Sequence, residues 1–166
     1  ESLQVAVICS LSSGDPISHD QISPVISLEK SIKNDTKKYR LQLARFYISL
    51  VRNPDLKNQK DIDYVFSQLR WLITDADPDI SLSVIQPLIV LDGKEKEISE
   101  LLIACVIQDH FNVNLIFSMG SVFFHFKEPV HFFTFLKAYG EKWLFKVNEN
   151  IYSNTAIYIR EKSPIV

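Results

Sequence analysis

The fold class depends on residues 113–126, whose sequence is VNLIFSMGSVFFHF. Apolar and β-branched residues dominate this stretch, and Gly120 divides it into two short runs, residues 113–119 and 121–126. Short apolar runs of this composition on either side of a glycine predict two strands joined by a hairpin turn. A strand pair at this point makes the domain a mixed one, because the segments before it have helical periodicity.

Three segments before this stretch have the spacing of amphipathic helices. In residues 36–52, apolar side chains recur every three or four positions, with Lys and Arg between them. Asn53-Pro54 ends this helix, since proline cannot continue one. Residues 61–74 repeat the pattern, and residues 95–111 predict a third helix of the same kind.

The remaining segments complete a mixed domain. They are predicted as an apolar helix at 2–11, a loop at 12–24, a mixed apolar segment at 80–91 broken by Pro87, a short helix at 131–139, and strands at 143–147 and 155–160. Helices followed by a small, mostly antiparallel sheet indicate an α+β or mixed α/β fold. The length of 166 residues fits one domain, residues 1–166.

Composition limits the classes of partner. A net charge of −2 argues against a nucleic-acid binder, which would carry a basic face. No apolar run approaches the roughly 20 residues that cross a bilayer. We therefore expect a soluble, intracellular, cytoplasmic protein with neither nucleic acid nor membrane as partner. Cys9 and Cys105 lie in apolar runs, which predicts two buried thiols, with a disulfide between them as the alternative.

A metal-dependent nuclease is one candidate function. Asp79 after Pro78, followed by Asp92 and Lys94, matches the PD…DxK pattern, in which two carboxylates hold Mg²⁺ and a lysine orients the attacking water. Asp92-Gly93 is equally a turn signal, and a turn would place Lys94 in solvent. Such an enzyme also needs a basic substrate surface, which the composition does not indicate. The nuclease is therefore kept as the alternative function.

The histidines do not form a metal motif. His19, His110, His125 and His131 lack the i, i+4 spacing of paired ligands, and the two cysteines are not in CxxC spacing. The aromatic residues between 123 and 135 lack interleaved basic residues, so they predict a hydrophobic core instead of a platform for stacked bases. We expect neither a metal nor another cofactor.

Residues 85–118 carry a resemblance to a known family. They run from Ile85-Gln86-Pro87-Leu88 through a helix with a polar first turn to Phe111-Asn112-Val113-Asn114. In residue types this resembles the otubain branch of the ovarian tumour (OTU) cysteine deubiquitinases, which enter a central strand through a Val-Asn-Ile-like sequence. The helices at 36–52 and 61–74 resemble the paired helices of that family. The resemblance implies an OTU-like papain-superfold domain, with N-terminal helices packed on a small sheet.

The resemblance also implies that catalysis has been lost. Ser2-Leu3-Gln4-Val5-Ala6-Val7 resembles the start of the nucleophile helix, with Ser2 in place of the cysteine. The late-strand histidine should fall within residues 151–154, where Asn154 stands as the degenerate position. A serine without a base is a poor nucleophile at neutral pH. We therefore expect a pseudo-deubiquitinase, a protein-binding or scaffold module whose partner is a protein, ubiquitin-like or part of a large assembly.

Overall fold

The computed structural model describes residues 19–30, 36–89, 91 and 93–143, and its regular structure is entirely helical over these residues. The helices are α2 (His19–Lys30), α3 (Lys37–Arg52), α4 (Gln59–Ile73), α5 (Pro78–Leu88), α6 (Glu95–Val106), α7 (Leu115–Phe123) and α8 (Pro129–Trp143). No strand occurs in the described part of the chain. The predicted α/β fold, with helices packed on a small antiparallel sheet, is therefore wrong.

Two of the predicted helices, α3 and α4, are confirmed, and local capping explains where they begin. The hydroxyl of Thr36 accepts a hydrogen bond from the backbone N–H of Tyr39 at 3.3 Å at the start of α3. Asn58 does the same for α4, accepting from the N–H of Lys60 at 3.0 Å. Such side-chain caps satisfy amide groups that have no partner within the helix.

The segment predicted as a β-hairpin is helix α7. Gly120, expected at the turn, is buried inside this helix, and Leu115, Met119 and Val122 are buried at helical spacing. A short apolar run cannot be assigned to strand or helix from its periodicity when its exposed side also carries an apolar residue, here Phe117, and few polar residues mark that side. Helices α5 and α8 cover α7 on two sides, through backbone contacts with α5 and ring contacts with α8.

Other boundaries also differ from the prediction. Helix α2 includes residues 19–24, which were predicted as loop, and it contains Pro24. Helix α6 ends at Val106, five residues before the predicted end at 111. Helix α8 extends on both sides of the predicted 131–139 and includes Trp143, where a strand was predicted to begin. The predicted helix at 2–11 and strand at 155–160 lie outside the described residues.

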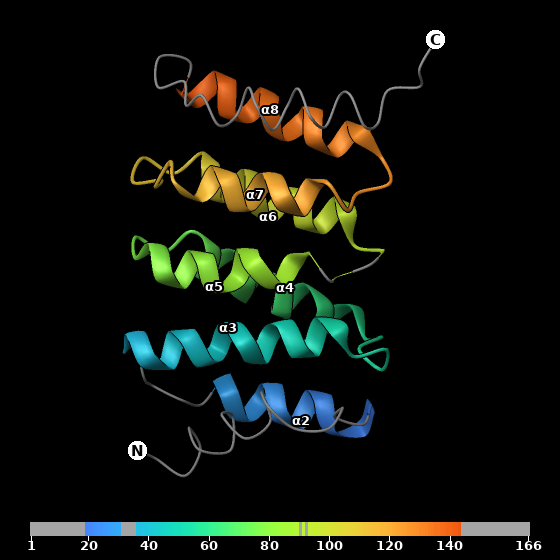
Figure 1. Ribbon diagram of the computed structural model, residues 1–166. Coiled ribbons are helices and arrows are strands. Elements are labelled where there is room, and N and C mark those ends of the chain that lie inside the picture. Colours follow the sequence, from blue (N-terminus) through green and yellow to red (C-terminus); the bar gives the residue numbers. More distant parts are fainter. Residues whose placement is uncertain (1–18, 31–35, 90, 92, 144–166) are drawn as a thin grey trace.

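The helices stack in two rows (Figure 1). One row contains α3, α5 and α7, the other contains α4, α6 and α8, and the extensive contacts join helices one or two places apart in the chain. The helices of the first row begin at residues 37, 78 and 115, and those of the second at 59, 95 and 129. The starts within a row are therefore 34 to 41 residues apart, in the range of helical-repeat proteins, in which each helix pair packs on the one before it.

The hydrophobic core runs through the stack between the two rows. Its largest fully buried side chains include Phe46 and Tyr47 of α3 and Phe123 and Phe135 of α7 and α8. None of the helices in the described ranges is long and apolar enough to span a bilayer.

Helix α2 is joined to α4 by polar contacts. Ser23 donates a hydrogen bond to Asp61 at 2.5 Å, and the hydroxyl of Tyr64 donates to the buried carboxylate of Glu29 at 2.8 Å. The ammonium group of Lys30 lies 3.9 Å from the centre of the Tyr64 ring, a cation–π contact. These contacts place α2 beside α4, continuing the second row.

Candidate functional site

The positions predicted to be degenerate catalytic residues lie outside the described residues. This applies to Ser2 and Asn154, and also to Cys9. The structure therefore gives no geometry for the comparison between a nucleophile position and a late-strand base.

The nuclease residues are not brought together. Asp79 is in the first turn of α5, whereas Lys94 is the N-cap of α6, on the side of the stack where α5 ends (Figure 1). The intervening length of α5 is roughly 14 Å at 1.5 Å per residue. The carboxylate of Asp79 pairs with the ammonium group of Lys37 at 2.6 Å, and Asp92 lies outside the described residues. Among the residues that the structure describes, no group of three or more His, Cys, Asp or Glu side chains could hold a metal ion.

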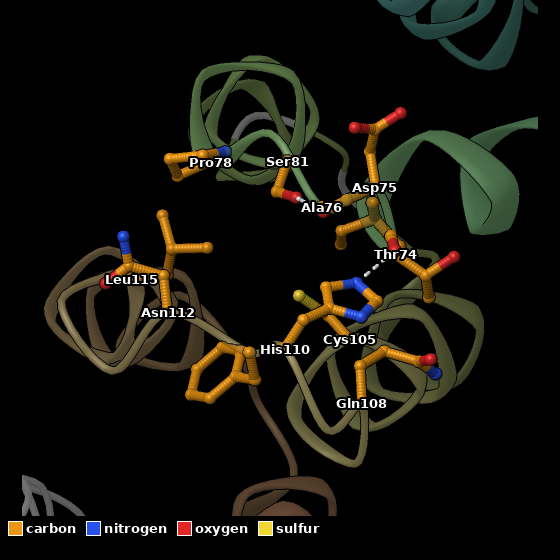
Figure 2. A pocket seen from close by; sticks show the side chains of 12 residues that line it. Thr74, Asp75, Ala76, Pro78, Ser81, Cys105, Gln108, His110, Asn112 and Leu115 are labelled. Carbon is orange, nitrogen blue, oxygen red and sulfur yellow. Dashed lines mark hydrogen bonds between the residues drawn. The ribbon is translucent and has the colours of Figure 1, made fainter.

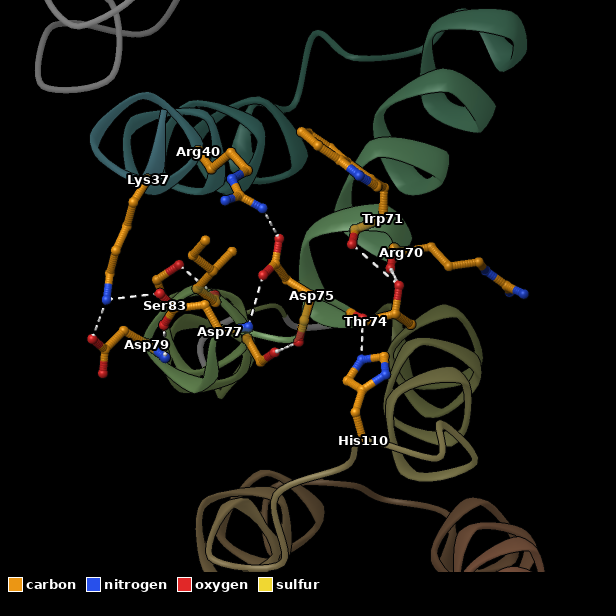
Figure 3. A network of polar contacts seen from close by, with 12 residues as sticks. Lys37, Arg40, Arg70, Trp71, Thr74, Asp75, Asp77, Asp79, Ser83 and His110 are labelled. Atoms are coloured by element: carbon orange, nitrogen blue, oxygen red, sulfur yellow. Dashed lines mark hydrogen bonds and ion pairs between the residues drawn. The ribbon is translucent and has the colours of Figure 1, made fainter. Parts of the chain in front are cut away.

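The acidic turn between α4 and α5 ties these helices to α3 (Figure 3). The Lys37 ammonium group lies 2.8 Å from the carboxylate of Asp77 and 2.6 Å from that of Asp79, and the Arg40 guanidinium pairs with Asp75. The hydrogen bond from Lys37 holds the pKa of Asp77 below its ordinary value. Asp75 also accepts the backbone N–H of Asp77 at 2.8 Å. The turn is thus an anchor between helices, with its charges already paired.

A second turn, between α6 and α7, is held from two sides. Nε2 of His110 lies 2.9 Å from the carbonyl oxygen of Thr74 at the end of α4. Because a carbonyl can only accept, Nε2 carries the hydrogen of this bond. The indole N–H of Trp143 donates to the carbonyl of Val106 at 2.6 Å, in a buried position. The ends of α4, α6 and α8 are therefore fixed relative to one another.

A small cavity between these two turns contains both a thiol and an imidazole (Figure 2). Its volume is about 10 Å³, room for one water molecule and no larger ligand. Cys105 is free and 3% exposed, which confirms the predicted buried thiol for this residue and removes the disulfide alternative. Burial raises the pKa of Cys105 to about 12, and the His110 ring is held by Thr74. A cysteine nucleophile needs a lowered thiol pKa, and Cys105 beside His110 does not have one.

The Cys105 thiol is expected to resist alkylation in the folded protein. With iodoacetamide at pH 8, a thiol of pKa near 12 is almost wholly protonated and also shielded from the reagent. Peptide mapping by mass spectrometry should show the Cys105 peptide modified only after denaturation. Modification of this peptide in the native protein, at the rate seen in denaturant, would contradict the burial described above.

A groove of about 430 Å³ opens between α4 and α6 in the described part of the chain. Its lining residues are Gln59, Ile62, Asp63, Phe66, Ser67 and Arg70 of α4, with Lys96, Glu97, Glu100 and Leu101 of α6. We call this feature the α4–α6 groove. Ile62 and Phe66 are half-buried and Leu101 is buried, so these three apolar side chains form its floor, while charged and polar side chains form its rim.

The rim of the α4–α6 groove has charges of both signs. Arg70 lies 4.0 Å from Glu100 across the two helices, so these charges offset one another. The remaining charged rim residues are Asp63, Lys96 and Glu97. The rim hydroxyl of Ser67 donates its hydrogen to the carbonyl of Tyr64 at 2.7 Å, and no imidazole is among the residues that line the groove. An apolar floor inside a rim of mixed charge is a lining suited to binding.

The sequence pattern did not single out this groove. Ile62 and Phe66 are apolar residues of the predicted amphipathic helix at 61–74, and the sequence pattern assigned neither of them to a binding site. The sequence did contain one indication of an uncovered surface. The apolar side of this helix is wider than a single neighbouring helix covers.

Comparison with known proteins gives no relative. No family model, no curated protein and no solved structure matches the chain. The resemblance to otubains therefore stays a prediction.

Proposed function

We propose that this chain is a non-catalytic scaffold module that binds a segment of a partner protein in the α4–α6 groove. The observation that carries this proposal is the groove itself, an opening of about 430 Å³ with an apolar floor and a charged rim on a rigid helical stack. Stacked helix pairs present extended surfaces of this kind, and such surfaces commonly serve in protein recognition.

The size and lining of the groove favour a peptide side chain as its occupant. Its volume falls in the usual range of roughly 300–1,000 Å³ for small binding sites. One large apolar side chain placed over Phe66 and Leu101 would bury enough surface to contribute about 1.5–3 kcal/mol. Rim charges then fix orientation and contribute specificity.

The rim also indicates the charge of the bound segment. Because Arg70 and Glu100 face each other, the remaining acidic residues, Asp63 and Glu97, outnumber the remaining base, Lys96. A segment with a basic residue next to its apolar anchor is therefore complementary. A ubiquitin-like partner is not part of this proposal, because that expectation came from a resemblance whose implied sheet is absent from the described residues.

Replacing Ser67 by arginine is expected to abolish binding in the groove. Ser67 is exposed on the rim, so the longer side chain fills the opening without disturbing the core. The probe is a phage-displayed library of random dodecapeptides, selected on the wild-type protein. Enriched peptides should bind Ser67→Arg at least about tenfold more weakly, a loss of about 1.4 kcal/mol.

Thr134→Arg on α8 is the matched control. Thr134 is also an exposed helical hydroxyl that donates to its own helix, to the carbonyl of Val130 at 2.8 Å, as Ser67 does to Tyr64. Peptides selected on the wild type should bind this variant normally. The proposal is wrong if no peptide is enriched, or if the enriched peptides bind both variants equally.

A further inference from the structure

A pocket separate from the α4–α6 groove opens where α5 and α7 end. Its volume is about 240 Å³, and we call it the α5–α7 pocket. The buried side chains in its lining are apolar and form its floor: Leu88, Leu91, Val122 and Phe126. The polar side chains in the lining are those of Glu95, the first residue of α6, and His125, just after α7. An apolar floor with a few polar groups is the usual lining of a small-molecule site.

The carboxylate of Glu95 brings a negative charge to the α5–α7 pocket. Its two oxygens accept the backbone N–H groups of Lys127 and Glu128, at 2.7 Å and 3.2 Å. These donors are uncharged and hold the carboxylate in place, and a carboxylate has about four acceptor positions in total. No Lys or Arg side chain is among the described residues that line the pocket. The carboxylate can therefore accept a further hydrogen bond from a cation.

The imidazole of His125 adds a second acceptor. Its Nδ1 atom lies 3.1 Å from the carbonyl oxygen of Ser121, in the last turn of α7. Because a carbonyl can only accept, Nδ1 carries the hydrogen of this bond, and Nε2 of the neutral ring is then an acceptor. Both polar side chains of the pocket therefore accept hydrogen bonds, and one of them is an anion.

Two helix ends add to the negative potential of the pocket. Helix α5 ends at Leu88 and α7 ends at Phe123, so the C-terminal ends of both helices lie at the pocket. Each such end carries a partial negative charge of about half an elementary charge, and neither helix has a basic residue in its last turn to offset it. The N-terminal end of α6 has the opposite partial charge, which the full charge of Glu95 outweighs. The pocket therefore favours a cation.

We propose that the α5–α7 pocket binds a small apolar amine, which pairs its ammonium group with Glu95 and places its hydrocarbon part over Leu91, Val122 and Phe126. An ammonium group only donates hydrogen bonds, so it complements a lining whose polar side chains accept them. A cavity of about 150 Å³ holds a benzene molecule, so a pocket of about 240 Å³ has room for a phenyl ring with a short aminoalkyl chain. This inference is independent of the α4–α6 groove.

Titration of the full chain with 2-phenylethylamine, followed by NMR at pH 8, tests this proposal. The methyl signals of Leu91 and Val122 should shift and then saturate. The comparison ligand is 2-phenylethanol, which has the same ring and chain length but a hydroxyl group in place of the ammonium group. It should bind at least about tenfold more weakly, because it has no charge to pair with Glu95. The absence of saturable shifts at these methyl groups would overturn the proposal, as would equal affinity for the amine and the alcohol.

His125→Lys tests the location and the charge preference of the site. His125 is exposed, so the substitution replaces an acceptor by a cation at the pocket without altering the core. The variant should bind 2-phenylethylamine at least about tenfold more weakly, and 2-phenylethanol about as well as the wild type does. Ser27→Lys is the matched control, because it adds the same charge at an exposed position of α2, at the other end of the described stack (Figure 1). This control should bind the amine normally, and equal effects of the two variants on amine binding would overturn the proposal.

Discussion

Phe123→Ala is expected to lower the free energy of unfolding by about 3–5 kcal/mol, the usual cost of removing a fully buried phenyl ring. Phe123 is 0% exposed, and its ring centroid lies 5.0 Å from that of Phe126, 5.3 Å from Phe132 and 4.8 Å from Phe135. This one ring joins α7, the following turn and α8. Its loss leaves a cavity and removes favourable ring contacts in addition to the buried area. Equilibrium unfolding in urea measures the effect as a shift of the transition midpoint.

Ile107→Ala is the control for this prediction. Ile107 is apolar but 44% exposed, so its truncation should change the free energy of unfolding by less than about 0.5 kcal/mol. A cost for Phe123→Ala as small as that of the control would mean that this ring is not at the centre of the packed helices.

Arg40→Ala is expected to cost about 2–3 kcal/mol, because it leaves the carboxylate of Asp75 without its charged partner. The side chain of Asp75 is 7% exposed and that of Arg40 is 24% exposed, so solvent screens this pair less than a surface pair. Asp75 also orders the α4–α5 turn through the N–H of Asp77. An unpaired Asp75 carboxylate would therefore weaken the packing of α3 against both α4 and α5. Chemical denaturation measures the change.

Two variants separate this effect from a general loss of side chain. Lys37→Ala removes another cation of α3 that pairs with the same turn, but this pair is exposed, so its effect should be much smaller. Arg40→Ala combined with Asp75→Asn should recover part of the lost stability, because the unpaired charge is removed. Full additivity of Arg40→Ala and Asp75→Asn would show that the two side chains do not interact.

The parts of the fold that were predictable have a clear polar side. Helix α3 alternates buried residues such as Tyr39 and Leu43 with exposed Lys38 and Arg45, so its period of 3.6 is visible in the sequence. Asn53-Pro54 also marks its end. In α4, the same contrast gave the correct helix to within two residues at each end.

The parts that failed are those in which the sequence lacks that contrast. In α7, Ile116, Met119 and Val122 are buried on one side of the helix, but the exposed side carries the apolar Phe117, so few polar residues mark it. A glycine in such a run looks like a turn in the sequence but is here a small residue buried in a helix. Because this segment was taken as a strand pair, the whole domain was assigned to the wrong class.

The candidate site was harder to predict than the fold. Each wall of the α4–α6 groove comes from one helix, and nothing in the sequence shows that residues near 62 and 101 face each other. Their alignment follows from the stacking of the helices in two rows. No repeat in the sequence indicates this stacking. The sequence did predict correctly that Cys105 is buried, since that depended only on its apolar neighbours.

The arrangement of contacts has a consequence for how the chain acquires its structure. Within the described ranges, extensive packing joins helices that are one or two places apart, so most interactions there connect residues close in sequence. Proteins with such low contact order fold on microsecond to millisecond timescales, because little loop-closure entropy is lost before contacts form. Structure can therefore begin at any adjacent pair of helices and spread in both directions. Hydrogen exchange should correspondingly be fastest at the two ends of the described stack and slowest near α5, with intermediate rates grading between them.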